Sequence, residues 1–159
     1  MDKIRPQFLT ILCVLTFIGS AMGIFGAISN YSSAGMASGL TKDAMEEARD
    51  KIEEQNEDES ATKIIGKIFD SVNDNITEDK IKNNAMASGI SNILTLVGAI
   101  LMWGLNKKGF WLYIIGAIVG ILGPLFIYDG IVGIIAGGGV AFISIIFCVL
   151  YFLNLKHLS

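Results

Sequence analysis

Charged residues are absent from four long stretches of this sequence. Windows 7–31, 83–106, 109–128 and 130–155 contain none of the chain's 12 Lys or Arg and none of its 15 Asp or Glu. Proton relays and ion-coupled sites inside membranes usually depend on such groups. The pattern therefore weighs against a transporter that uses ionisable residues, without excluding transport by other means.

Histidine and cysteine are also scarce. His157 is the only histidine, so a multi-histidine metal site or a Ser-His or Cys-His nucleophile pair within the apolar stretches is excluded. Cys13 and Cys148 both lie in apolar stretches, where we expect small apolar core residues and no disulfide. We predict no catalytic residue, no metal site, no cofactor and no enzymatic activity. With no basic patch, nucleic acid is not an expected partner, and no small-molecule substrate is evident.

The sequence does contain long apolar runs. A helix needs about 20 apolar residues to cross the hydrocarbon core, and only helices satisfy the backbone of such single segments in lipid. We predict transmembrane helices at 8–30, 85–105, 110–128 and 131–153. The expected fold is all-α: a polytopic four-transmembrane-helix bundle with an external α-helical insertion between spans one and two. The first run continues past a signal-peptide-like Gly19-Ser20-Ala21, so we expect it to remain uncleaved.

Basic residues next to the spans indicate their orientation, because Lys and Arg favour the cytoplasmic side. Segment 31–84 holds 13 Asp or Glu against 7 Lys or Arg, and the short connection between the last two spans holds only Asp129. We predict cytoplasmic N and C termini, and three regions: 1–30, an external acidic helical domain at 31–84, and 85–159. The basic residues that carry this prediction are Lys3, Arg5, Lys107, Lys108 and Lys156.

Segment 31–84 has apolar residues at helical spacing, which predicts two or three amphipathic helices. Thr41 and Ser60 are expected N-caps of the first two helices, with a polar loop at 55–60 between them. Thr77 is expected to cap a third helix that continues into span two. The carboxylates Asp70, Asp74, Glu78 and Asp79 do not have EF-hand spacing, so an exposed acidic helix face is favoured over a calcium site. The two stripes are Leu40, Ala44, Met45, Ala48 and Ile52, and Ile64, Ile65, Ile68, Phe69 and Val72.

Small residues recur four apart inside three of the spans, a spacing that lets helix backbones approach closely. We predict that these glycines pack helices, within one chain in the favoured interpretation and against a second chain in the alternative. Gly123-Pro124 predicts a packed kink in span three, with a hinge as the alternative. In span two, Ser91, Asn92 and Thr95 are candidates for polar contacts between helices. The packing residues are Gly19, Gly23, Gly116, Gly120, Gly133 and Gly137.

Two Asn-x-Ser/Thr tripeptides, Asn30-Tyr31-Ser32 and Asn75-Ile76-Thr77, fall in or beside the predicted external segment. They matter only in a host that glycosylates its proteins, and such short motifs often arise by chance.

The run RPQFLTILCVLTFIGS at 5–20 resembles the start of small four-span bacterial membrane proteins. This resemblance implies a bacterial inner membrane, with 31–84 periplasmic or extracellular, and implies no activity. The loop layout is similar to that of claudins, but 31–84 lacks their tryptophan motif and cysteine pair. Tetraspanins differ as well, since their large loop is the second outer one.

Three function classes follow, in order of preference. The first is an accessory or scaffolding subunit that binds other membrane protein subunits, or itself, through the glycine-spaced helices and the acidic external domain. The second is an oligomeric channel or transporter component, which would require Ser91, Asn92 and Thr95 to face a cavity. A membrane enzyme comes third. In every case the lipid bilayer is the expected environment.

Overall fold

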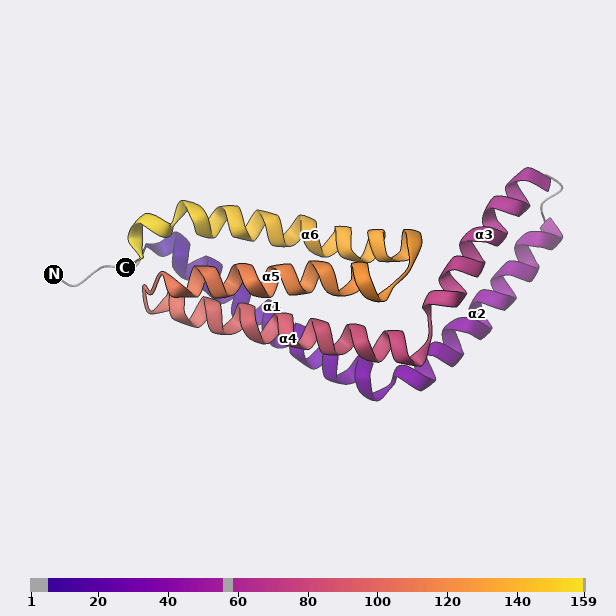
Figure 1. Ribbon diagram of the computed structural model, residues 1–159, viewed down its shortest axis with the longest axis horizontal. Helices are drawn as coiled ribbons and strands as arrows, with labels where there is room; N and C mark the ends of the chain where they lie inside the picture. Colours follow the sequence, from indigo (N-terminus) through magenta and orange to yellow (C-terminus); the bar gives the residue numbers. More distant parts are fainter. Residues whose placement is uncertain (1–5, 56–58, 159) are drawn as a thin grey trace.

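The computed structural model describes residues 6–55 and 59–158, and this part of the chain is helical with no β-strand (Figure 1). Four of its helices, α1, α4, α5 and α6, are long and apolar enough to cross a membrane, which is compatible with an integral membrane protein. The elements are α1 (Gln7–Ser32), α2 (Ala34–Gln55), α3 (Glu59–Asn75), α4 (Glu78–Trp103), α5 (Lys108–Ile127), α6 (Gly130–Leu153) and the short 3₁₀ helix η1 (Leu155–His157).

The four predicted spans agree with these helices to within two residues, apart from the start of α4. That helix begins at Glu78 because Thr77 caps it: the Thr77 hydroxyl accepts a hydrogen bond from the Lys80 backbone N–H at 3.3 Å. The prediction that a capped helix continues into span two is therefore confirmed. Pro124 lies inside α5, which remains helical to Ile127.

Two predicted caps in the segment between α1 and α4 are wrong. Thr41 lies inside α2, because the run from Ala34 contains no proline and the helix starts seven residues earlier. Ser60 lies inside α3, which begins at Glu59. Residues 56–58 of the predicted loop, and Lys3 and Arg5 of the orientation argument, lie outside the described residues.

The four long helices form an open arrangement in place of a closed ring. The contact between α4 and α5 is the most extensive, α1 packs on α4, and α6 packs on α5, whereas α1 and α6 touch each other little. Figure 1 shows α1 running obliquely, so that it lies near α6 at the end of the bundle where both chain termini lie. We refer to that end as the termini end and to the opposite one, from which helices α2 and α3 project as a hairpin, as the hairpin end.

The apolar core is concentrated at the termini end. Residues of all four long helices and of the C-terminal tail meet there, and Tyr151 and Leu9 are fully buried. Cys13 belongs to this core and Cys148 packs against it, as expected of small apolar residues. The buried cluster consists of Leu9, Leu12, Cys13, Met102, Phe110, Tyr113, Tyr151 and Leu158.

Helices α2 and α3 form an antiparallel hairpin that projects from the hairpin end (Figure 1). Asn75, only 1% exposed, ties it to the bundle: its amide donates to the Asp129 carbonyl at 3.2 Å and accepts from the Asp129 backbone N–H at 2.5 Å. Lys80 donates to both Asn75 and Asp129, at 3.1 and 2.6 Å. Because its amide nitrogen is buried in this network, Asn75 is not available as a glycosylation acceptor in the folded chain.

Candidate functional site

The contact between α4 and α5 depends on glycines that allow the two backbones to touch. A methyl carbon added at Gly98 would lie 2.7 Å from both the Gly109 carbonyl oxygen and the Tyr113 backbone nitrogen. One added at Gly116 would lie 2.9 Å from the Thr95 backbone nitrogen. Both approaches are shorter than any normal carbon contact, so only glycine fits at these positions.

A second set of glycines either faces polar side chains of α4 or belongs to α6 and faces α5. A methyl carbon at Gly120 would lie 2.6 Å from the Ser91 hydroxyl oxygen, and one at Gly23 would collide with the Asn92 amide group. Gly133 lies against the Pro124 carbonyl, and Gly137 against Leu125. Within the described residues these glycines therefore lie against other parts of the same chain.

Gly19 differs from its expected packing role. A methyl carbon there would meet nothing within 4 Å, although Gly23, one turn later, packs tightly. Gly19 lines a cavity between the helices, whereas Gly23 lies against Asn92 of α4.

Sequence reasoning missed the packing of Gly98 and Gly109, and considered Gly123, which packs against Ala87, only as part of a kink. A four-residue spacing does not reveal them. The available signal is a seven-residue spacing, Gly109, Gly116 and Gly123, which keeps glycine on one face of a helix that packs against a neighbour.

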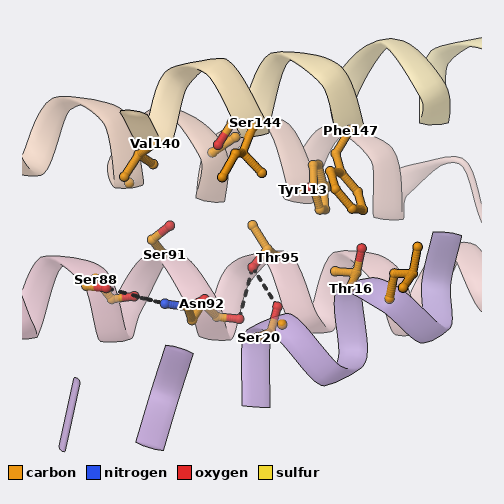
Figure 2. A pocket seen from close by; sticks show the side chains of 15 residues that line it. Thr16, Ser20, Ser88, Ser91, Asn92, Thr95, Tyr113, Val140, Ser144 and Phe147 are labelled. Atoms are coloured by element: carbon orange, nitrogen blue, oxygen red, sulfur yellow. Dashed lines mark hydrogen bonds between the residues drawn. The ribbon is translucent and has the colours of Figure 1, made fainter. Parts of the chain in front are cut away.

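Polar side chains extend from the α4–α5 contact, which we call the seam, into the space between the long helices (Figure 2). The Ser91 hydroxyl donates to the Gly116 carbonyl of α5 at 2.7 Å, and Thr95 shares a hydrogen bond of 3.1 Å with Ser20 of α1. The Asn92 amide instead donates within its own helix, to the Ser88 carbonyl at 2.8 Å. Ser91 and Thr95 therefore connect helices, while Asn92 contacts α1 by packing against Gly23.

These residues line a cavity of about 310 Å³, which we call the polar groove. Its floor consists of α4 and α5 and its walls of α1 and α6, so it lies between two helices that touch each other little. Its lining contains no charged residue: Leu15, Thr16, Gly19, Ser20, Ser88, Ser91, Asn92, Thr95, Tyr113, Ala117, Gly120, Val140, Ile143, Ser144 and Phe147.

The polar groove is closed toward the termini end by the buried core. The Thr16 and Tyr151 hydroxyls share a buried hydrogen bond of 2.8 Å, and the rings of Tyr113 and Tyr151 pack with centroids 4.9 Å apart. In the described part of the chain, the Ser144 hydroxyl and the Asn92 amide oxygen make no hydrogen bond to another residue. The groove therefore has a blind end and retains free hydrogen-bonding capacity on two of its sides.

The α2–α3 hairpin offers a different kind of surface. Arg49 of α2 pairs with Asp70 of α3 at 2.9 Å, and both side chains are substantially exposed, so the contribution of this pair to stability is small. No group of three or more His, Cys, Asp or Glu side chains is close enough to hold a metal within residues 6–55 and 59–158.

No protein-family model, curated protein or solved structure matches the chain in comparisons with known proteins. The resemblance of 5–20 to small four-span bacterial proteins stays a prediction.

Proposed function

We propose that the protein is a non-enzymatic accessory subunit of a larger membrane complex and that the α2–α3 hairpin contacts its partner. The observation that carries the proposal is an exposed apolar pair on the outward face of α3. Ile64 and Ile68, one helical turn apart, are 63% and 48% exposed, whereas Ile65 and Phe69 are partly buried in the hairpin. The apolar stripe of α3 is therefore wider than the hairpin covers, which is typical of a helix that packs on two neighbours.

Charge supports a partner of defined chemistry. Residues 34–75 hold 11 Asp or Glu against 5 Lys or Arg. An acidic surface next to exposed isoleucines is complementary to a basic amphipathic segment of another membrane protein. The glycines expected to bind partners are mostly used inside the chain, so the hairpin carries the proposed interaction.

We further propose that both termini lie in the cytoplasm of a bacterial inner membrane and that the hairpin lies on the periplasmic or extracellular side. Support comes from Lys107 and Lys108, at the α4–α5 connection, and Lys156, after α6, which are all at the termini end, while Asp129 lies between α5 and α6 at the hairpin end. Single cysteines at Lys67 and Lys156 in intact cells provide the test. An impermeant maleimide should label the first and not the second, and the reverse pattern would contradict the orientation.

A photoreactive amino acid at Ile68, introduced in native membranes, tests the hairpin as a partner surface. We expect one discrete adduct from Ile68 and none from Glu47, an exposed position on α2 that serves as the matched control. The protein in the adduct, tagged in turn, should copurify the wild-type chain but not the Ile64→Ser and Ile68→Ser double variant. Equal adducts from both positions, or unchanged copurification of the double variant, would contradict the proposal.

The polar groove favours a second candidate, an oligomeric channel or transporter component. Ser91, Asn92 and Thr95 line a cavity, which is the arrangement that this class requires. Because the groove is closed toward the termini end, a continuous path would require another copy of the chain. Swelling of proteoliposomes in glycerol, compared with liposomes that contain a Gly120→Leu variant, would distinguish this class: faster swelling with the wild type supports it, and equal rates contradict it.

A further inference from the structure

The polar groups that line the groove raise the free energy of the protein in a bilayer unless each of them has a hydrogen-bond partner. Polar groups placed in hydrocarbon without a partner carry a large desolvation cost. Most of the lining hydroxyls satisfy this requirement within the chain, as Ser91, Thr95 and Ser20 do. Within the described residues, the Ser144 hydroxyl on α6 makes no hydrogen bond, and the Asn92 amide oxygen on α4 accepts none although the amide group lies against Gly23 of α1. The Ser144 hydroxyl, which can donate and accept a hydrogen bond, and the Asn92 amide oxygen, which can accept one, therefore come from different walls of one cavity (Figure 2).

The route into the groove leads from the lipid. Its floor is formed by α4 and α5, which pack closely, and its opening lies between α1 and α6, which touch little. Apolar side chains of both walls are among the residues that line the groove, including Leu15, Ile143 and Phe147. A molecule that enters here arrives from the hydrocarbon and must keep an apolar portion between the two walls.

The absence of charge limits what the groove can take. None of its lining residues is ionisable at neutral pH, so an ionic group would lose its hydration without finding a counter-charge. Hydroxyl and carbonyl groups, in contrast, match the free capacity of Ser144 and Asn92. At about 30 Å³ per water molecule, 310 Å³ corresponds to roughly ten waters. This volume holds a polar end group and the first carbons of a chain, but not a whole lipid.

We propose that the polar groove is a binding site for a neutral, membrane-soluble amphiphile with a hydroxyl or carbonyl group. The polar group bonds to Ser144 and Asn92, and the hydrocarbon portion leaves the groove between α1 and α6. This site is independent of the proposed hairpin interaction, because the two surfaces belong to different parts of the fold.

The test uses the full chain in phosphatidylcholine vesicles and a photoactivatable hexadecanol with its diazirine close to the hydroxyl. After irradiation, we expect saturable labelling of peptides that contain residues 15–20 and 140–147. Unlabelled hexadecanol should compete. Hexadecane, which lacks the polar group, and hexadecyl sulfate, which is charged, should not compete at the same membrane concentration.

Two variants connect the labelling to the groove. Ser144→Ala removes one hydrogen bond and should lower the affinity for the probe by about fivefold. Ser144→Leu also fills the cavity and should abolish saturable labelling. The matched control is Ile145→Leu, at a neighbouring position that is 58% exposed, which should label like the wild type. Ser144 makes no hydrogen bond within the described residues, so both variants should retain the wild-type melting temperature, which is measured in parallel.

Three results would overturn the proposal. One is labelling spread evenly over lipid-exposed positions outside these peptides, such as Ile135 and Phe126. Another is competition by hexadecane as strong as that by hexadecanol. The third is unchanged labelling of a folded Ser144→Leu variant, since the filled cavity would then be irrelevant to the probe. Loss of partner adducts from the hairpin would leave all three results unaffected.

Discussion

Two regions of the helix bundle, the α4–α5 contact and the space between α1 and α6, differ in how closely the helices approach each other. Toward α4, glycines bring backbone against backbone, and the contact leaves no room for a single added methyl at Gly98. Between α1 and α6, which flank the same pair of helices, hydroxyl and amide side chains line an open cavity. In lipid there is no hydrophobic drive between helices, so close van der Waals contact must hold them together. The difference suggests that the α4–α5 seam supplies rigidity and that the groove is left free for binding.

The largest expected effect is at the seam. Gly98→Ala should lower the free energy of unfolding by about 1–3 kcal/mol, because the added methyl collides with the α5 backbone, which cannot move aside as a side chain can. Thermal unfolding in mild detergent is the measurement. Gly138→Ala is the matched control, since its methyl meets nothing within 4 Å and alanine favours a helix by about 1 kcal/mol over glycine. Equal melting temperatures for the two variants would contradict the close backbone contact between α4 and α5 at Gly98.

A smaller effect is expected where the groove closes. Tyr151→Phe removes the buried hydrogen bond to Thr16 and should cost about 0.5–1.5 kcal/mol. Tyr31→Phe, at a position 46% exposed, should leave stability unchanged. Both are compared by thermal unfolding. If Tyr151→Phe were as stable as wild type, the hydroxyl pair would not hold α1 against α6.

The smallest effect distinguishes two glycines on one helix. Gly23→Ala should destabilise the protein by about 1 kcal/mol or less, because the Asn92 side chain that it meets can rotate. Gly19→Ala should be neutral or slightly stabilising, since its methyl projects into open space. Measured side by side, the two variants locate where α1 leaves α4. A larger loss for Gly19→Ala than for Gly23→Ala would mean that α1 packs closely at Gly19, and would contradict the open space beside it.

The four long helices could be predicted from the sequence because the exclusion of charge over some 20 residues is a strong, local requirement of the bilayer. The start of α2 at Ala34 could not, since the expected cap at Thr41 rested on composition and a helix continues wherever nothing stops it. Asn75 shows the same limit. Its sequence context indicates only a glycosylation tripeptide, whereas its role depends on contacts with Asp129, 54 residues away.

The candidate site was predicted only in part. Ser91, Asn92 and Thr95 were recognisable because polar residues are rare inside apolar spans. That they share a cavity with Ser20 and Ser144 depends on the crossing of α1, which no local pattern encodes. A small-molecule site was not expected from the sequence, because the residues that line the groove are spread over four helices that are far apart in the sequence.

The most direct test of the open arrangement is a pair of spin-label distances across α1 and α6. Labels at Phe8 and Phe152 measure the distance between α1 and α6 at the termini end. Labels at Phe25 and Ile135, each 17 residues closer to the hairpin end on its own helix, measure the distance there. All four positions are exposed, and Cys13→Ser with Cys148→Ser provides the background if its melting temperature is retained. We predict a clearly longer distance at the hairpin end. Equal distances would mean a closed, parallel bundle and would contradict the polar groove.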